Sequence, residues 1–415
     1  MVWAENFSII SLKIGKVGFK LKSLFKLKIQ NISLNLGTNF GLCVAIFSLN
    51  FVTNWKIVSA FGLESPRRFF DTWQVLKSAD CFKSIGWNIY NTIDTDICHN
   101  YYYGSSLIRF LRILNFGVHI NLVVGIVFLF FLAISISGYF QTNSRSDLLI
   151  FLLVISSPAV SLLAERGNFD ILIFALFTLA LTLISNGIPK FGFIILCVAS
   201  LFKFYTLPLT ILISLLPEFR RIRAFTIPLV FLTTIVCFTD LQKLRAISID
   251  IPNGTFGLSE PGLYLKRLGF DVSHNLAIIV GAFSIFLLWL TLCFVNRKIY
   301  VFESLFKDVS SGEIRLLEFA GAIIFLSCFF IGVNFDFRLI FLVATMCLTI
   351  QRLTNNNWVK FFKMVLLSIL WLSFESKVLQ PIGDFLIMLV AIYYARICLL
   401  YIRNEIGYPK ESDVL

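Results

Sequence analysis

Long apolar stretches with almost no charged residues are the feature of this sequence that most restricts how the chain can fold. They follow one another from residue 39 to residue 402, and most of the polar connections between them are short. An apolar stretch of about 20 residues can cross the hydrocarbon core of a bilayer as an α-helix. Residues of the types AVILMFWYC make up 58% of the chain and charged residues only 14%, whereas about a quarter of an average soluble domain is charged. The sequence therefore predicts an all-α polytopic membrane protein, and it excludes a soluble globular enzyme, a disordered protein and a small disulfide-linked scaffold.

The predicted spans define one membrane domain, residues 39–403, in which no internal repeat is evident. A basic amphipathic segment, residues 1–38, precedes this domain and is expected to lie on the anionic cytoplasmic leaflet. Residues 404–415 form a cytoplasmic tail. The predicted spans are residues 39–61, 113–139, 147–164, 169–186, 191–216, 224–239, 274–296, 318–333, 338–353, 358–374 and 383–402.

Lysines and arginines set the expected orientation, because short cytoplasmic loops carry an excess of both. The lysine-rich residues 1–38 lie inside, so the loop 62–105 after the first span lies outside. The same bias accounts for most of the formal net charge of +12, and we expect no nucleic-acid partner. No cleavable signal peptide is visible, so we expect the first span to be a retained signal anchor. This topology, with both termini cytoplasmic, indicates a bacterial inner (plasma) membrane.

The span at 191–216 conflicts with that orientation if it crosses the membrane once. A single crossing would place Arg220, Arg221 and Arg223 outside, against the positive-inside rule. Lys203 and Pro208 also interrupt the stretch near its middle. We therefore predict a short helical hairpin with Lys203 near its apex, which leaves ten full crossings in the rest of the chain. A charge at this depth is tolerated only beside a wet cavity lined by protein.

Four polar clusters interrupt the apolar runs, and in this topology all four lie on the external side. Short polar turns cap membrane helices in any polytopic protein, but four on one face, three of them with a cation near the membrane, favour a shared site. Lys203 and Arg338 are placed to neutralise a phosphate whose lipid tail lies in the bilayer. The carboxylates are suited to accept a hydroxyl proton or to bind sugar hydroxyls. The clusters are Arg67 to Asp71, Glu165 to Asp170, Lys203 to Tyr205 and Asn334 to Arg338.

Two of these clusters carry a family resemblance. The stretch SSPAVSLLAERGNFDILIFALFTLAL (156–181), followed by LFKFYTLPL (201–209), resembles the integral-membrane glycosyltransferases of the GT-C class. The likeness is closest to family 87, the polyprenyl-phosphate-mannose-dependent α-mannosyltransferases. The loop FFDTWQVLKSADCFKSIGWNIY (69–90) is similar to the first external loop of that family, and NFDFRLIFL (334–342) looks like a motif of related bacterial members. The likeness covers roughly residues 40–345, although the Tyr-Pro-Pro-like segment that often precedes the second span is replaced here by Tyr101 to Ser106.

The resemblance implies a reaction and a role for each cluster. A hexose, mannose in the family, would move with inversion from a polyprenyl-phosphate sugar to an acceptor glycan or glycolipid on the extracytoplasmic face. The external loop after the first span would supply the general base, Asp71, and the donor phosphate would bind Lys203, Arg338 and, more weakly, Arg166. Six further residues would orient side chains or sugar hydroxyls, namely Glu165, Asn168, Asp170, Tyr205, Asn334 and Asp336.

Several alternatives stay open on the residues alone. Asp80, Asp94 and Asp96 share the loop with Asp71, and any of them could be the base. Lys and Arg can stabilise a monophosphate leaving group by themselves, so no cofactor is required, and no His, Cys and carboxylate set has convincing metal-ligand spacing. Cys81 and Cys98 would form a disulfide if their loop faces an oxidising compartment, and would otherwise be free thiols.

Two other functions compete with glycosyl transfer. A polytopic transporter, or a flippase for lipid-linked sugars in a surface-polysaccharide pathway, would also have many spans, intramembrane cations and a broken helix. Such carriers usually have two related halves with broken helices in corresponding positions, and the hairpin at 191–216 has no such counterpart. A polysaccharide ligase or polymerase would normally need a large late external loop, and residues 240–273 are modest in length. These comparisons favour the enzyme.

Overall fold

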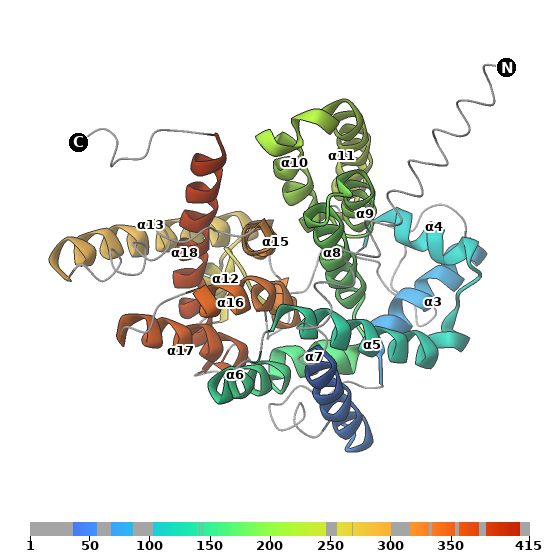
Figure 1. The fold of residues 1–415 in the computed structure, drawn as a ribbon, viewed down its shortest axis with the longest axis horizontal. Helices are drawn as coiled ribbons and strands as arrows, with labels where there is room; N and C mark the ends of the chain where they lie inside the picture. Colours follow the sequence, from blue (N-terminus) through green and yellow to red (C-terminus); the bar gives the residue numbers. More distant parts are fainter. Residues whose placement is uncertain are drawn as a thin grey trace.

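The computed structural model describes an almost entirely helical chain (Figure 1). In the described part, the strands are limited to β1 (Thr255–Phe256) and β2 (Asn334–Phe335), which pair antiparallel. The all-α prediction is confirmed. The described residues are 36–55, 68–85, 103–140, 142, 144–245, 255–267, 269–299, 316–331, 334–352, 357–372 and 379–406.

Most of the helices lie on the predicted spans, although the helix on the second predicted span begins at Asn121 and not at residue 113. Each apolar run is long enough to bury a helical surface on its neighbours. In chain order they begin with a helix at Leu36–Val52. The others are α3 (Phe70–Ile85), α4 (Ser105–Ile113), α5 (Asn121–Tyr139), α6 (Arg145–Ile155), α7 (Pro158–Arg166), α8 (Asp170–Ser185), α9 (Pro189–Phe202), α10 (Leu207–Leu215), α11 (Arg223–Arg245), α12 (Glu260–Arg267), α13 (His274–Ile299), α15 (Leu316–Ile331), α16 (Ile340–Arg352), α17 (Asn357–Leu372) and α18 (Leu379–Ile406). Short 3₁₀ turns are η2 (Val118–Ile120), η3 (Phe204–Thr206), η4 (Pro217–Ile222) and η5 (Asp336–Leu339).

Several helices are long and apolar enough to cross a membrane. By length and composition, four of the described helices qualify, and a fifth does if α6 and α7 form one bent span. The shorter apolar helices have 10–17 residues. The four are Val118–Tyr139, Pro217–Gln242, Asn275–Leu292 and Gln380–Arg403. These helices are compatible with a polytopic membrane protein.

Two features differ from the prediction. The span predicted at 147–164 is bent by 47° between α6 and α7. Ser157 caps α7 by accepting from the Val160 N–H, and Pro158 occupies the first turn of α7. The bend arises here because proline has no N–H with which to continue the hydrogen bonds of α6. The segments predicted as loops at 62–105 and 240–273 contain α3 and α12, and α4 begins at the last residue of the first. Polar and charged residues interrupt α3 and α12, so they lack the long apolar run by which the spans were recognised.

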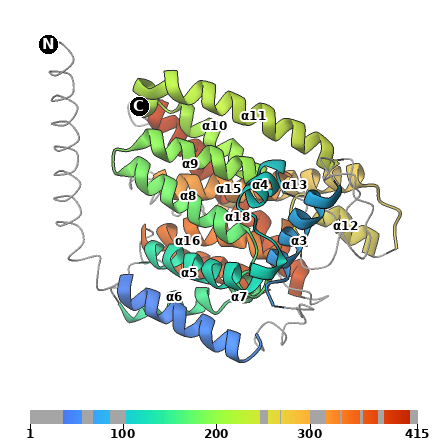
Figure 2. The ribbon, with the colours of Figure 1, turned by 90° about the vertical axis from the view of Figure 1, so that its right-hand side faces the viewer.

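The chain doubles back at Lys203, as the sequence predicts. Lys203 is extended (φ −145°, ψ 122°), and it separates α9 from η3 and α10. Near the start of α9, the Phe193 ring lies 5.5 Å from Phe219 in η4, and the Lys190 ammonium lies 5.9 Å from the Phe225 ring in α11. The beginning of α9 and the segment that follows α10 therefore lie at the same end of the molecule. Figures 1 and 2 show α8, α9, α10 and α11 side by side.

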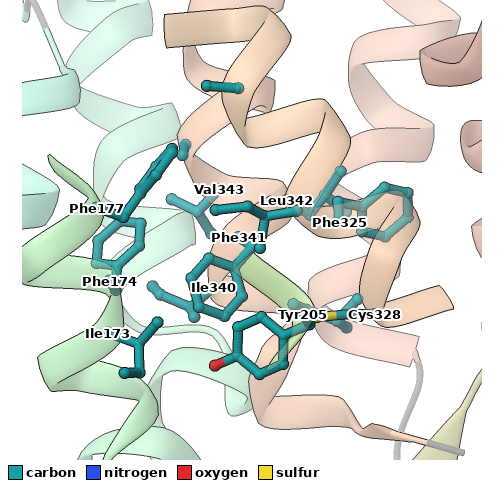
Figure 3. Close-up of a cluster of buried hydrophobic side chains, with 14 of the residues drawn as sticks. Ile173, Phe174, Phe177, Tyr205, Phe325, Cys328, Ile340, Phe341, Leu342 and Val343 are labelled. Carbon is teal, nitrogen blue, oxygen red and sulfur yellow. The ribbon is translucent and has the colours of Figure 1, made fainter. Parts of the chain in front are cut away.

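An apolar core supports the turn that follows Lys203. Phe174 and Phe177 of α8 pack with Phe341 of α16, whose ring centre is 5.9 Å from that of Phe174 (Figure 3). Phe325 and other side chains of α15 complete this cluster. The Tyr205 ring lies at its edge, 5.2 Å from Phe341. This packing holds η3 and the beginning of α16 against α8.

Candidate functional site

The fully buried carboxylate of Asp170, at the start of α8, binds two cations and a phenol. Its Oδ1 lies 2.8 Å from the Lys203 ammonium and accepts a hydrogen bond of 2.5 Å from the Tyr205 hydroxyl. Its Oδ2 accepts from the Arg338 guanidinium at 3.2 Å. The Arg338 guanidinium also lies 5.7 Å from the Tyr205 ring, within the range of a cation–π interaction. We call Asp170, Lys203, Tyr205 and Arg338 the inner cluster.

The carboxylate of Asp71, in the first turn of α3, forms a second cluster beside it. Its Oδ1 accepts from Arg166 through both Nε (2.9 Å) and Nη2 (2.6 Å), and its Oδ2 accepts from the Asn168 amide. Asn168 joins the two clusters, because its Oδ1 also accepts from the Asp170 backbone N–H at 2.8 Å. We call Asp71, Arg166 and Asn168 the outer cluster. The structure thus brings the predicted base and the predicted phosphate ligands into one hydrogen-bonded network.

The turn after α7 places Asp71 in this network. Gly167 ends α7 in the left-handed conformation (φ 55°), and a Cβ there would lie 2.7 Å from the Thr72 hydroxyl oxygen and 2.8 Å from the Phe69 ring. Glycine therefore fits both the backbone conformation and the close contact. Thr72 donates to the Gly167 carbonyl, and the Phe69 N–H donates to the Glu165 carbonyl at 2.9 Å. These bonds dock the start of α3 on the Glu-Arg-Gly-Asn turn.

Tyr103 is a site residue to which the sequence assigned no role, although Tyr101 to Tyr103 lie in the loop of the first polar cluster. The Lys203 ammonium lies 4.0 Å from the centre of its ring, and its hydroxyl donates to Asn168 Oδ1 at 3.5 Å. Burial, together with the negative charges of Asp71 and Asp170, raises the pKa of Tyr103 well above its usual range, so the phenol stays neutral and can donate. The sequence feature that could have indicated Tyr103 is its position immediately before Gly104 and helix α4. In this segment the chain differs from the Tyr-Pro-Pro-like pattern of the family that it resembles.

The inner cluster brings two cations to one carboxylate. Lys203 and Arg338 both pair with Asp170, and their side chains are only 6% and 16% exposed. Two buried cations at one point are a set of side chains that can bind an anionic ligand.

The outer cluster is balanced in charge and more accessible. Arg166 pairs with one carboxylate, and its side chain is 26% exposed. Its guanidinium also lies 5.7 Å from the ring of Phe70, which precedes Asp71. Glu165, the remaining charged residue of the turn, is buried. An acceptor could therefore approach the network from the side of Arg166.

For several other predicted site residues, the structure describes the backbone alone or nothing. Asn334 lies in β2, paired with Phe256, and Asp336 begins η5; the structure describes their backbone but not their side chains. Asp94 and Asp96, two alternative bases, lie outside the described residues. Asp80, the third alternative, is exposed near the other end of α3 and accepts from the Val118 N–H at 3.1 Å, so it caps η2.

The predicted disulfide between Cys81 and Cys98 can be checked only at Cys81. Cys81 is buried in α3, and its sulfur is engaged in a disulfide. Cys98, its predicted partner, lies outside the described residues, so this pairing stays a prediction. No set of three or more His, Cys, Asp or Glu side chains in the described part is grouped so that it could hold a metal ion.

Comparisons with protein-family models, with curated proteins and with solved structures found no match to this chain.

Proposed function

We propose that this chain is a membrane glycosyltransferase of the GT-C class. It transfers a hexose, mannose in the family that it resembles, from a polyprenyl-phosphate sugar to a glycan or glycolipid acceptor, with inversion. The proposal includes ten full crossings plus the hairpin, both termini in the cytoplasm, and a site on the extracytoplasmic face of a bacterial inner (plasma) membrane. The observation that carries it is the inner cluster, in which Lys203 and Arg338 share one buried carboxylate beside the outer cluster of Asp71.

The inner cluster is suited to the donor phosphate. A phosphodiester carries one negative charge, and the cluster brings two cations together. Arg338 offers a planar set of donors and Lys203 a mobile point charge, so both can turn from Asp170 towards phosphate oxygens. Tyr205 can keep its hydrogen bond to Asp170 while this happens. The same cations stabilise the phosphate as negative charge develops on the leaving oxygen.

The outer cluster is suited to activate the acceptor. Arg166 and Asn168 fix the orientation of the Asp71 carboxylate. An acceptor hydroxyl would transfer its proton to Asp71 while its oxygen bonds to the anomeric carbon of the sugar. The bond between that carbon and the phosphate oxygen breaks, and polyprenyl monophosphate leaves with the electron pair. Inversion follows because the oxygen attacks from the face opposite the phosphate.

Product analysis with a labelled donor tests this proposal. The purified protein is reconstituted in liposomes with polyprenyl-phosphate [¹⁴C]mannose and a crude extract of bacterial lipid-linked glycans as acceptors. We expect label in a new glycosidic bond, together with released polyprenyl monophosphate. A change of leaflet with the donor intact would support a flippase instead and would overturn the enzyme assignment.

A further inference from the structure

Asp240, near the end of α11, is a buried carboxylate that caps a helix distant in sequence. It is 3% exposed, and its Oδ2 accepts from both the backbone N–H and the hydroxyl of Ser105, each at 2.8 Å. Ser105 begins α4, and the N-cap position of α4 is Gly104, which has no side chain to accept from the first turn. A carboxylate at this point satisfies an otherwise unpaired N–H and is favoured by the helix dipole. Asp240 therefore supplies the cap that α4 lacks.

The same turn is bonded to the residues that precede Lys203. The Gly104 N–H donates to the Phe202 carbonyl at 3.1 Å. A Cβ at Gly104 would lie 2.0 Å from the Leu201 carbonyl oxygen, so only glycine allows the two backbones to approach this closely. One turn before Asp240, the Cys237 thiol donates to the Ser200 carbonyl at 3.3 Å. The end of α11, the start of α4 and the end of α9 are thus joined within a few residues of Lys203.

Tyr103 immediately precedes this junction, and its ring lies 4.0 Å from the Lys203 ammonium. We infer that Asp240 is a positioning residue for the donor-phosphate end of the site, because it fixes the start of α4 and so holds Tyr103 against Lys203. Asp240 contacts no residue of either cluster directly and acts through Ser105 and Gly104. The inference rests on the proposed function in one respect, namely that Lys203 binds the donor phosphate.

Kinetics of the Asp240→Ala variant test this role. We expect the KM for polyprenyl-phosphate mannose to rise about tenfold, as expected for a lost helix cap, while the KM for the acceptor stays within twofold. Asp240→Asn should restore most of the donor affinity, because an amide oxygen can still accept from Ser105. Thr239→Ala is the matched control, since Thr239 is exposed and its hydroxyl bonds only within α11, to the Val236 carbonyl. Equal rises in the two KM values would indicate a general loss of structure and would overturn the inference.

A double variant separates positioning from fold stability. In a Tyr103→Ala background, Asp240→Ala should change the donor KM by less than about twofold, because the residue through which it acts is gone. If Asp240→Ala has the same effect in both backgrounds, Asp240 stabilises the fold without positioning Tyr103, and the inference is wrong.

Hydrogen exchange gives a readout that does not depend on catalysis. In detergent, the amides of residues 103–108 should exchange about tenfold faster in Asp240→Ala and at the wild-type rate in Thr239→Ala. If the wild type transfers no sugar, the proposed function fails. The affinity for polyprenyl monophosphate then serves as the measurement in place of the donor KM. Weaker binding of polyprenyl monophosphate by Asp240→Ala would still support the inference. Unchanged exchange, or faster exchange with unchanged phosphate binding and donor KM, would overturn it.

Discussion

Asp170 is the residue on which the inner cluster depends. It is fully buried, and it is the carboxylate to which Lys203 and Arg338 are both paired. A buried charge that loses its partner costs far more than an exposed one, because water cannot replace the missing interaction. The sequence predicted Asp170 only as one of six residues that orient the substrate. Its pairing with both cations depends on how close the turn after α9 lies to the start of α8. No local sequence pattern gives that distance.

Removing the charge of Asp170 should therefore destabilise the protein. Asp170→Asn leaves two buried cations facing a neutral amide, and we expect a loss of about 3–5 kcal/mol in unfolding free energy. The midpoint of thermal unfolding in detergent measures this loss. Asp80→Asn is the control, because Asp80 is exposed and caps η2 through a single hydrogen bond. Similar midpoints for both variants would show that the paired charges do not stabilise the fold.

The charge of Lys203 gives a prediction about donor binding. Lys203 is one of the two cations of the inner cluster, and the donor carries the negatively charged phosphodiester. Lys203→Ala should therefore weaken the use of the donor more than the use of the acceptor. The measurement is the KM for each of the two substrates.

Lys203→Arg is the matched variant for this measurement, because a guanidinium keeps the positive charge. Its donor KM should rise less than that of Lys203→Ala. A defect in the use of the acceptor alone in Lys203→Ala would contradict the assignment of Lys203 to the phosphate.

At the scale of the elements, the site depends on α8, α9 and the turn that follows α9. Lys203, at the end of α9, reaches Asp170, at the start of α8, because these two helices run antiparallel. After Lys203 the chain turns back, so η4 lies beside the start of α9. With 14 and 9 residues, α9 and α10 are about 21 Å and about 14 Å long, shorter than a hydrocarbon core of about 30 Å. A straight continuation of α9 would instead carry Arg220 to Arg223 away from that end of the molecule.

Thiol labelling tests the hairpin in whole cells. Arg221→Cys places a thiol in η4, where Arg221 is exposed. We expect a membrane-impermeant maleimide to label it only after the cells are permeabilised. Lys83→Cys, at an exposed position in the last turn of α3, should be labelled in intact cells and serves as the control. Equal labelling of both in intact cells would place η4 outside and would rule out the hairpin topology.

The sequence predicted the apolar helices and the reversal at Lys203 because both leave one-dimensional signals, namely hydropathy and the distribution of basic residues. It did not predict α4, whose buried face consists of only a few residues, including Leu107, Ile108 and Leu111. It also did not predict the bend before α7, because a Ser-Ser-Pro segment within an apolar run does not by itself end a span. The cap that Asp240 provides could not be predicted at all, since its partner is 135 positions away in the chain.

At the scale of the whole molecule, the fold assembles one site from four distant parts of the chain. The hydrogen bond between Asp71 and Arg166 spans 95 positions, and the bond between Asp170 and Arg338 spans 168. Sequence reasoning placed these residues on one external face from charge patterns and motif likeness. The pairing itself, in which Arg166 and Asn168 orient the Asp71 carboxylate, required the three-dimensional arrangement.

Sugar transfer by Asp71→Asn, compared with Asp80→Asn, tests the central claim most directly. Both residues lie on α3, but only Asp71 belongs to the charged network, and asparagine at 71 can still accept from Arg166. The measurement is the initial rate of glycosidic-bond formation from labelled polyprenyl-phosphate mannose, with unfolding midpoints recorded for both variants. We predict that Asp71→Asn lowers the rate at least about a hundredfold at a temperature at which the variant is still folded, while Asp80→Asn keeps the rate within about twofold of wild type. Transfer at the wild-type rate by Asp71→Asn would contradict the account.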